Sequence, residues 1–411
     1  QINNNKDYLI GEKIPVNNVS EHHHPILEYF FNASNEIGIK KNTNLTTSSQ
    51  DQVGHYNINT YRGTRHSSSK VFLKPISKNQ RLTILNNTQV KKLIIQDKKI
   101  TGIKIQNKSL EQIIKLSQGA ILCSGSIMTP YLLMHSGIGD KEHLKQHNKE
   151  IIIDNFNVGR NLQDHLGLDY LFKTNHHSLN KSLGTWPGRI TSFLKYIYNR
   201  SGPLSLSINQ SGGYINWNSK HHYPNLQIYF NPLTYSITHK NKRPLLKTDK
   251  FNGFIIGYNS CRPKSLGRIT LNSPNPDDTP LIDPNFLSHD EDIYDVKCAI
   301  NFSKILASTD NIKKIRKESV KHDLLNANEE DMIHHFKSNA VSIYHPCGTC
   351  KMHEDPKKGV VSERLKVHGL ENLWIADASV FPNITSGNIN APVMMLANLG
   401  SKFIIEDLKK I

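Results

Sequence analysis

The sequence predicts a fold of the α+β or α/β class, with an antiparallel sheet and covering helices, from three observations. Strand-like segments cluster between Leu82 and Cys123. A strand, a glycine turn and a short helix follow one another up to Gly139, and the chain ends with a strand and a helix. With 411 residues the chain is long enough for two or more domains that each bury a core.

The first half of the chain is predicted to form strands from Leu82 onward, up to Cys123. Residues 1 to about 55 are polar apart from a helical stretch at 25–33. Asp97, Lys98 and Lys99 read as a turn between two β-rich segments, which predicts a hairpin. The predicted strands of this half are 82–85, 90–96, 100–106, 113–116 and 120–123.

A short helix is predicted after the last of these strands. Thr129 is a good N-cap residue, and Pro130 is tolerated in a first turn. Gly137 can end the helix in a left-handed conformation. A strand, a glycine turn and a helix in this order allow the helix to pack closely on a sheet.

The second half mixes strands and helices without a repeat. Strands are predicted at 253–258, 267–271 and 373–377, and helices at 293–307 and 391–410. Apolar residues of the last helix recur with a spacing that keeps one helix face on a core. They are Val393, Leu396, Ala397, Gly400, Ile404 and Leu408.

The composition is that of a globular protein, with 37% hydrophobic and 21% charged residues. The basic residues behind the formal net charge of +16 are scattered, which indicates a solvated surface and not a nucleic-acid partner. No run of about 18 apolar residues predicts a transmembrane helix. Five cysteines are an odd number and too few for the disulfide framework of a secreted protein, which favours the cytoplasm. Peripheral attachment to a membrane is the alternative location. The tract at 22–24 is interpreted as a solvated loop of three histidines, so no metal site is expected.

His345 stands in a turn, Tyr344-His345-Pro346-Cys347-Gly348-Thr349-Cys350, whose proline and glycine fix the backbone. Imidazole has an ordinary pKa of about 6.5, which suits a general base near neutral pH. Cys347 and Cys350 are interpreted as packing residues, with a redox pair or half of a zinc site as alternatives. Residues 158–165 end in Asp164-His165 but are interpreted as structural, since no G-x-S-x-G nucleophile motif accompanies them.

Three separated motifs resemble the glucose-methanol-choline (GMC) family of FAD-dependent alcohol oxidoreductases. They are the His345 turn, the segment from Gly125 to Gly139, and Ser386-Gly387-Asn388-Ile389-Asn390-Ala391-Pro392. The resemblance extends from about Arg62 to Ile411. Among subgroups it is greatest to choline-dehydrogenase-like members.

By this resemblance the chain would oxidise an alcohol to an aldehyde or a ketone. His345 would accept the hydroxyl proton while a hydride passes to N5 of the flavin. Asn388, or less favourably Asn390, would hydrogen-bond the substrate oxygen as its negative charge grows. A quinone-type compound or oxygen would then accept the electrons.

The resemblance also implies contacts to FAD. Val90 matches a position whose backbone meets the adenine. Asp377 and Ala378 match the stretch beside the ribityl and pyrophosphate groups, although Asp377 has a turn or an N-cap role as its alternative. The N–H of Ala391 or of Val393 would bind a flavin carbonyl, as helix N-termini bind anions. In the alternative interpretation Asn390 is simply the N-cap of the last helix.

The dinucleotide fingerprint of the family, G-x-G-x-x-G, does not occur in the sequence. We therefore expect an incomplete FAD-binding domain, made of residues 1–165 and 336–411, with a substrate-binding domain at 166–335 between them. Weak or no FAD binding is expected of this chain alone, with a missing N-terminal half or a second copy as a partner. The alternative function is an inactive fragment or interaction partner that has lost its FAD-binding half.

Overall fold

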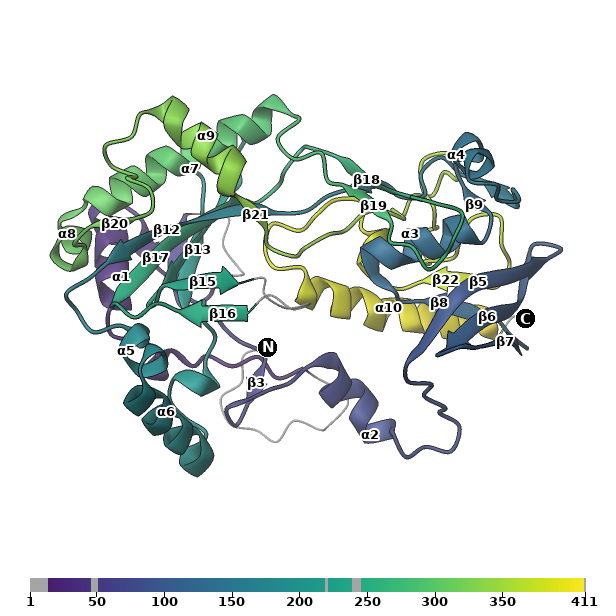
Figure 1. The fold of residues 1–411 in the computed structure, drawn as a ribbon, viewed down its shortest axis with the longest axis horizontal. Helices are drawn as coiled ribbons and strands as arrows, with labels where there is room; N and C mark the ends of the chain where they lie inside the picture. Colours follow the sequence, from purple (N-terminus) through teal and green to yellow (C-terminus); the bar gives the residue numbers. More distant parts are fainter. Residues whose placement is uncertain (1–13, 46–50, 219–220, 239–244, 410–411) are drawn as a thin grey trace. The chain divides into compact units, whose positions relative to one another are not determined.

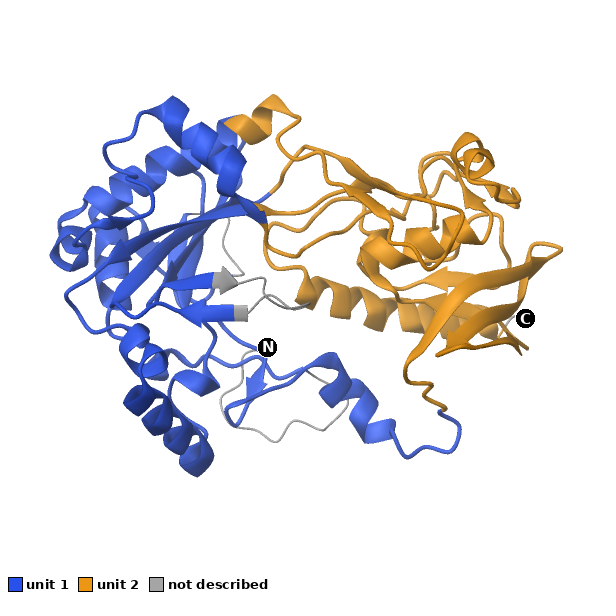
Figure 2. Cartoon of the chain, viewed as in Figure 1, with its two compact units in different colours: residues 1–82, 167–261, 294–341 blue, residues 83–166, 262–293, 342–411 orange. Residues whose placement is uncertain are grey.

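The structure, a computed structural model, describes residues 14–45, 51–218, 221–238 and 245–409. They form two compact units, each made of three stretches of chain (Figure 2). Unit 1 consists of residues 1–82, 167–261 and 294–341, and unit 2 of residues 83–166, 262–293 and 342–411. The two units group the chain differently from the predicted sequence ranges, because residues 1–82 belong with unit 1 and 262–293 with unit 2.

Unit 1 is built on a largely antiparallel sheet with the strand order β1-β2-β13-β14-β17-β12-β20. β1 and β2 pair in parallel, whereas the pairs β2–β13, β13–β14, β14–β17, β17–β12 and β12–β20 are antiparallel. The strands are β1 (Lys40–Lys41), β2 (Gln52–His55), β13 (Ser211–Ile215), β14 (Leu226–Asn231), β17 (Gly253–Ser260), β12 (Leu166–Lys173) and β20 (Ser319–Val320).

A row of stacked phenylalanine rings forms the core of unit 1. Phe30 of α1 (Leu27–Glu36) stacks on Phe230 of β14. The Phe230 ring stacks on Phe254 of β17, which stacks on Phe172 of β12. All four side chains are fully buried, so this row fixes α1 on one face of the sheet (Figure 1).

The other elements of unit 1 are short strands and helices around this sheet. They are η1 (Ser20–His22), β3 (Thr60–Tyr61), β4 (Thr64–Arg65), η2 (Ser69–Leu73), α2 (Lys74–Ile76), α5 (Leu179–Gly184), α6 (Trp186–Asn199), η3 (Pro203–Ser205), β15 (Tyr235–Thr238), β16 (Leu245–Thr248), α8 (Asp310–Ile315) and α9 (Glu329–Asn339). At the borders of the unit lie α7 (Asp290–Ser308) and β21 (Val341–Ser342).

Unit 2 combines an antiparallel three-stranded sheet with a parallel strand pair. The three-stranded sheet has the order β5-β6-β7, and β8 pairs with β22 in parallel register. The remaining strands pair as β10-β9 and β11-β18-β19. The elements are β5 (Thr88–Gln96), β6 (Lys99–Asn107), β7 (Leu110–Lys115), β8 (Ala120–Leu122), α3 (Gly125–His135), β9 (Ile138–Gly139), α4 (Lys141–Gln146), β10 (Ile153–Asp154), β11 (Arg160–Leu162), β18 (Gly267–Thr270), β19 (Leu281–Asp283), β22 (Leu373–Ile375), η4 (Ala378–Val380) and α10 (Asn390–Leu408).

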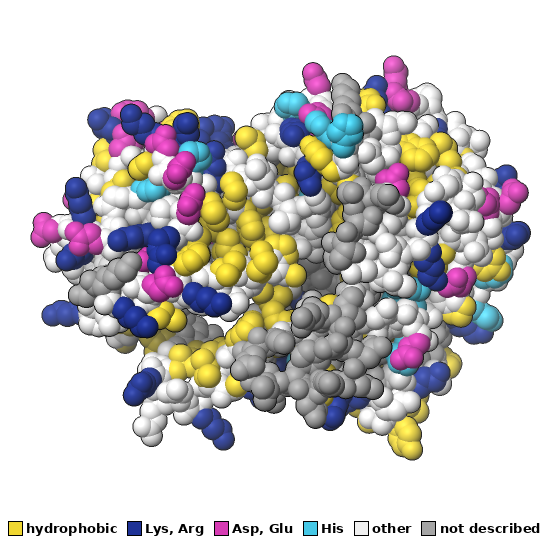
Figure 3. Space-filling model, turned by 180° about the vertical axis from the view of Figure 1, so that it is seen from behind, with side chains coloured by type: hydrophobic (Ala, Val, Ile, Leu, Met, Phe, Trp, Pro, Cys, Tyr) yellow, Lys and Arg dark blue, Asp and Glu magenta, His cyan; other side chains and the backbone are white. Residues whose placement is uncertain are grey.

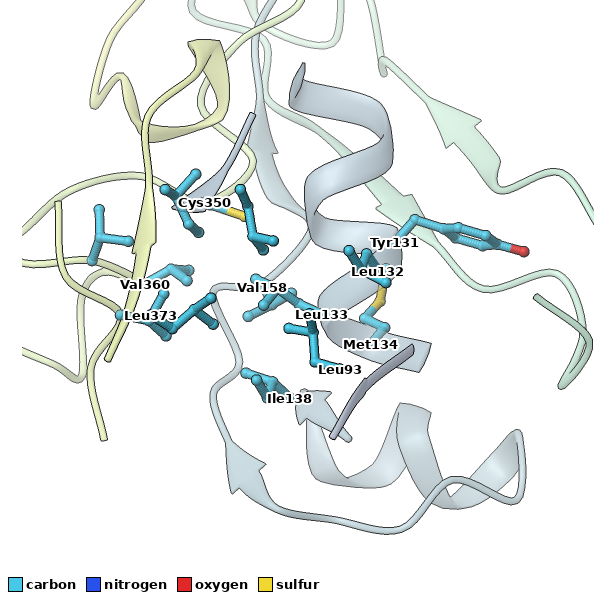
Figure 4. Packing of buried hydrophobic residues seen from close by; sticks show 14 of the residues in the cluster. Leu93, Tyr131, Leu132, Leu133, Met134, Ile138, Val158, Cys350, Val360 and Leu373 are labelled. Carbon is cyan, nitrogen blue, oxygen red and sulfur yellow. The ribbon is translucent and has the colours of Figure 1, made fainter. Parts of the chain in front are cut away.

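The core of unit 2 surrounds α3. Leu133 and Met134 of this helix are buried in one cluster with Val158, with Leu93 of β5 and with Leu373 of β22, as Figure 4 shows. These contacts bring together segments that are far apart in the sequence. They hold α3 beside β22 and η4, where several of the predicted site residues lie.

Most predicted elements are present with shifted ends, but two predictions were wrong. Residues 82–85 form no strand: Leu82 lies in a turn, and the side chains of Ile84 and Leu85 are 45% and 51% exposed. The helix predicted to begin after Thr129 already begins at Gly125. Pro130 lies inside it and cannot donate to the carbonyl of Ser126, which accepts a hydrogen bond from Thr349 Oγ1 (2.6 Å) instead.

Charged side chains are spread over the surface. Figure 3 shows Lys and Arg scattered over one face and hydrophobic side chains gathered in a broad area of the same view. The scatter agrees with the interpretation of the net charge as solvated surface. Among the described residues, no helix has the length and apolar character needed to cross a membrane.

Candidate active site

His345 lies in a turn whose backbone is fixed from two sides. The N–H of Cys347 donates to the carbonyl of Gln163 (2.9 Å), and the N–H of Gln163 donates back to Cys347 (3.0 Å). Gly348 has a φ of +89°, and a Cβ there would stand 2.5 Å from the carbonyl oxygen of Asn161. Glycine is therefore required at this position for conformation and for space.

Asp164 anchors the same turn. Its Oδ1 accepts hydrogen bonds from the backbone N–H groups of His165 and His345 (2.8 Å each), and its Oδ2 accepts one from the Ser342 hydroxyl. Burial raises the pKa of Asp164, against the lowering effect of these three hydrogen bonds. The carboxylate thus fixes the position of His345 through its backbone.

The imidazole of His345 contacts one polar side chain at each ring nitrogen. Its Nδ1 lies 3.0 Å from Nδ1 of His165, and its Nε2 lies 3.2 Å from Nδ2 of Asn388. Because the Asn388 amide nitrogen can only donate, Nε2 of His345 is the acceptor. The proton of the neutral ring is then on Nδ1, which donates to His165.

This arrangement leaves the lone pair of His345 Nε2 on the side of Asn388. His345 is buried, with 8% of the residue exposed, and this burial lowers the pKa of its imidazole below the ordinary value. Desolvation disfavours the imidazolium, so the ring is neutral at neutral pH. A neutral imidazole with an available lone pair can accept a proton from a hydroxyl group.

The N-terminal turn of α10 begins two residues after Asn388, whose side chain contacts this ring. Asn390 is the first residue of α10 and is exposed, and the N-cap residue is Ile389, which makes no side-chain cap. Asn390 is therefore not the N-cap that the alternative interpretation proposed. The N–H of Val393 donates to the carbonyl of Ile389 (3.0 Å). Of the two N–H groups predicted to bind a flavin carbonyl, that of Ala391 therefore remains, because it lies in the first turn, where N–H groups have no partner within the helix.

Asp377 ties α3 to η4. Its Oδ2 accepts hydrogen bonds from the N–H of Gly125 (2.9 Å) and from Thr129 Oγ1 (2.6 Å), and its Oδ1 accepts one from the N–H of Ser379 (2.8 Å). Only 6% of the residue is exposed. As the N-cap of η4 it fits the alternative interpretation, and little of its hydrogen-bonding capacity is left for a ribityl or ribose hydroxyl.

The neighbourhood of Asp377 nevertheless fits a nucleotide. Gly125 begins α3 with a φ of +80°, and a Cβ there would meet nothing within 4 Å. The hydroxyl of Ser126 is buried and has no hydrogen-bond partner among the described residues. The carbonyl of Ala378 accepts from the N–H of Gly348 (3.1 Å). Open space beside an unpartnered hydroxyl at a helix N-terminus suits a polar ligand atom.

Val90 lies apart from these residues, on β5 at the edge of its sheet. It pairs with Ile105 of β6, and the register shifts between Val90 and Lys92. With 37% of the residue exposed, Val90 is accessible to a ligand. The described structure therefore gathers His345, Asn388, Asn390 and Ala391 near one another and places Val90 on a separate sheet.

The two cysteines of the turn are buried free thiols. Cys347 packs with Ile384 and Ile389, and Cys350 belongs to the cluster around α3. Burial raises the pKa of the Cys347 thiol to about 12 and that of Cys350 well above its ordinary value. Neutral buried thiols suit the packing interpretation better than a reactive redox pair.

Sequence reasoning missed the role of residues 164 and 165 beside His345. Their motif was interpreted as structural, whereas both side chains contact the turn or the ring of His345. One feature of the sequence could have indicated this role: residues 164 and 165 are both ionisable, and no other charged residue follows Arg160 in their motif. It gave no indication of the partner, which is 180 positions away.

Two sequence models, both described as GMC oxidoreductase, match this chain, one at residues 4–167 and the other at 263–397. An alcohol dehydrogenase [acceptor] of Pseudomonas putida is 33% identical over 384 residues, which is 93% of this chain and 68% of the relative. An oxygen-dependent choline dehydrogenase of Brucella anthropi is 28% identical with the same coverage. The likeness thus begins well before Arg62.

Solved structures give the same likeness. A formate oxidase of Aspergillus oryzae superposes with a TM-score of 0.86 at 25% identity, over 97% of this chain and 73% of the other. A pyridoxine 4-oxidase has a TM-score of 0.79 at 23% identity, over 96% and 71% of the two chains. The second supports the fold alone.

Proposed function

We propose that this chain, which belongs to the GMC oxidoreductase family, oxidises an alcohol to an aldehyde or a ketone with His345 as the base. Members of the family are FAD-dependent oxidoreductases that act on CH–OH donors, and FAD is the cofactor of this chain. The observation that carries the assignment of His345 is its hydrogen bonding, with Nδ1 bound to His165 and Nε2 facing Asn388.

We propose a part in the reaction for each of these residues, supported by their hydrogen bonds. A substrate hydroxyl that displaces Asn388 from Nε2 of His345 can donate its proton there. Asn388 can then donate its amide hydrogen to the same oxygen, which stabilises the alkoxide character that develops. His165 accepts a hydrogen bond from Nδ1–H of His345, which holds the proton on Nδ1 and so keeps the lone pair on Nε2. Asp164 positions the backbone of the turn.

FAD, when bound, would take the hydride from the substrate carbon. We propose that the N–H of Ala391 and the amide of Asn390 face its flavin ring, and that the backbone of Val90 meets the adenine. Asp377 and Ala378 shape the site between them through η4 and α3. Val393 contributes through its side chain, which packs with Cys347 and Ile389, and not through its backbone N–H.

The partners follow from the chemistry. We propose a small alcohol as the substrate and either a quinone-type acceptor or oxygen for the electrons, in the cytoplasm, with no nucleic acid involved. Residues 1–165 and 336–411 would then serve FAD and residues 166–335 the substrate. The inactive-fragment alternative is not favoured, because the hydrogen bonds of His345, Asp164 and Asn388 are all formed.

Rapid mixing without oxygen tests the proposal. The chain with FAD added is mixed with choline or with a straight-chain primary alcohol, and the loss of flavin absorbance is followed. At least one alcohol should reduce the flavin, and His345→Gln should slow this step by about 10²- to 10⁴-fold. The exposed His334→Gln is the matched control. Equal rates in His345→Gln and the unchanged protein would contradict the assignment.

A further inference from the structure

Helix α6 of unit 1 presents its apolar face to solvent. Six large side chains of this helix are more than half exposed. They are Trp186 (76%), Ile190 (54%), Phe193 (56%), Leu194 (58%), Ile197 (54%) and Tyr198 (93%). A surface helix normally turns such side chains toward the core. An apolar helix face left in water marks a surface for another molecule.

The opposite face of α6 is packed against α5 and cannot be exchanged for the apolar one. A Cβ at Gly188 would stand 2.3 Å from the carbonyl oxygen of Lys181. One turn later, the buried Ser192 donates its hydroxyl to the carbonyl of Ser182 (3.3 Å). Only small residues fit this contact, so rotating the helix would place large side chains against the backbone of α5.

Both ends of α6 are fixed. At the start, Thr185 Oγ1 accepts a hydrogen bond from the N–H of Gly188 (3.2 Å), and Arg189 Nε donates to the carbonyl of Leu183 (2.7 Å). At the end, Arg200 adopts the left-handed conformation with a φ of 55°, and its N–H donates to Tyr196. The helix beside α5 in Figure 1 therefore holds its apolar side chains in a defined orientation.

The apolar residues form one continuous stripe with basic borders. At 3.6 residues per turn, the six side chains span about 140° around the helix. Arg189 lies at one border of this arc and Lys195 at the other. Long basic side chains at such borders can extend their charges away from an apolar surface while their stems stay on it.

The charge of the segment is entirely positive. Residues 179–200 contain Lys181, Arg189, Lys195 and Arg200 and no Asp or Glu. A second copy of this chain would bring four like charges against the same four, which disfavours a symmetric dimer through this face. A surface that combines hydrocarbon with negative charge satisfies both the stripe and its borders.

We propose that α6 lies in the plane of a membrane surface rich in anionic lipids, with its apolar stripe among the acyl chains. A single amphipathic helix with aromatic and aliphatic residues on one face and lysine or arginine beside them has the features of such an anchor. This attachment is peripheral and does not depend on the proposed chemistry of the active site.

Sedimentation with lipid vesicles tests the proposal on the whole chain. The protein is mixed with vesicles of phosphatidylglycerol and phosphatidylcholine, and with vesicles of phosphatidylcholine alone. Binding should be strong only to the first and should weaken in high salt. The double substitution Phe193→Glu/Ile197→Glu should reduce binding by about tenfold or more. Phe156→Glu, at a phenylalanine of unit 2 with 57% exposure, is the matched control and should bind as before.

A second readout reports the depth of the helix. Brominated acyl chains should quench the fluorescence of the exposed Trp186. Trp186→Phe should remove most of that quenching, since Trp374 is buried and Trp217 is half-buried with its Nε1–H bound to Asn301 (2.9 Å). The proposal is overturned if the protein does not bind anionic vesicles, or if the double variant, still folded by circular dichroism, binds equally well. A third outcome also overturns it: the unchanged protein is a dimer by sedimentation velocity, the double variant is a monomer, and neither of the two binds vesicles. The stripe would then be an interface between copies of the chain.

Discussion

His345 shows how one buried residue gains its chemistry from neighbours that are distant in sequence. Its backbone is held by Asp164, its Nδ1 by His165 and its Nε2 by Asn388. Each contact removes a freedom that a histidine in an open loop would keep: position, tautomer and ring rotation. The residue is thereby prepared to accept a proton at one defined atom.

The pH dependence of the reaction should report this environment. Burial lowers the pKa of His345, so the neutral base persists to a pH below the ordinary value of about 6.5. We expect kcat/KM to stay level down to that pH and to fall as the pH decreases through the lowered pKa. The measurement is the rate of flavin reduction against pH at low alcohol concentration.

The acid limb must belong to His345 for this interpretation to hold. In His345→Gln the limb should disappear together with most of the rate. An acid limb that is unchanged in this variant, or one centred above the ordinary pKa of histidine in the unchanged protein, would show that another group controls the step.

Substituting His165 should separate positioning from proton transfer. His165→Phe keeps a ring of similar size but removes the acceptor for the Nδ1 proton of His345. The tautomer with its proton on Nε2 becomes accessible, so we expect kcat/KM to fall by about 10²-fold while KM changes little. The acid limb should also move to lower pH, because the neutral acceptor no longer stabilises the imidazolium. A loss of rate without this movement would indicate a merely structural role.

At the scale of elements, the sequence predicts segments whose pattern is local. The apolar spacing of α10, the hairpin at Asp97 and Lys98 and the positive φ of Gly137 follow from nearby residues, and the structure confirms all three. The interior position of Pro130 could not be predicted, because it depends on a hydroxyl from Thr349 that satisfies the carbonyl of Ser126. The same holds for the site, since His345 was recognisable from its turn but its bond to His165 was not.

Two glycines inside helices should respond differently to alanine. Replacing glycine by alanine in a helix normally stabilises it by about 1 kcal/mol. At Gly188 the new Cβ would meet backbone atoms of α5, with the Lys181 oxygen at 2.3 Å, so α6 must move. At Gly400 it would meet Cδ1 of Leu365 at 2.3 Å, the end of a flexible side chain that can turn away.

We therefore expect Gly188→Ala to lower the free energy of unfolding by about 1–3 kcal/mol and Gly400→Ala to change it less. Urea unfolding followed by circular dichroism measures both variants under one condition. Equal effects at the two positions would show that the contact between α5 and α6 yields as easily as the side chain of Leu365.

For the molecule as a whole, buried histidines should limit stability in acid. The His135 ring, in unit 2, has both nitrogens buried without a partner among the described residues, and burial lowers its pKa to about 4. In unit 1, His23 contacts His55 (Nδ1 to Nδ1, 2.8 Å), and burial lowers its pKa to about 4. At 22–24, where the sequence predicts a solvated loop, His22 is exposed, whereas His23 is half-buried.

The sign of the effect follows from the direction of these shifts. Below about pH 6.5 an unfolded histidine binds a proton that the folded one refuses, so the unfolded state is favoured as the pH falls toward 4. We expect the free energy of unfolding to decrease over this window. In His135→Leu the decrease should be shallower, which urea unfolding at several pH values measures. Parallel curves for the variant and the unchanged protein would exclude His135 as a source.

The affinity for FAD depends on the whole molecule and not on any single residue. The parallel pair β8–β22 has Ile121 49% exposed, although parallel strands are usually covered on both faces. The residues that suit the flavin are present in the first turn of α10, but no G-x-G-x-x-G loop is available to bind the pyrophosphate.

We therefore expect this chain to bind FAD with a Kd of about 1 μM or weaker, measured from the quenching of flavin fluorescence as the protein is titrated into FAD. Riboflavin in place of FAD should then lose only the proposed backbone contact of Val90 to the adenine, because no loop for the pyrophosphate is present in this chain. Tight stoichiometric binding of FAD that riboflavin cannot match would instead show that Gly125, Ser126 and the N-terminus of α3 hold the nucleotide half.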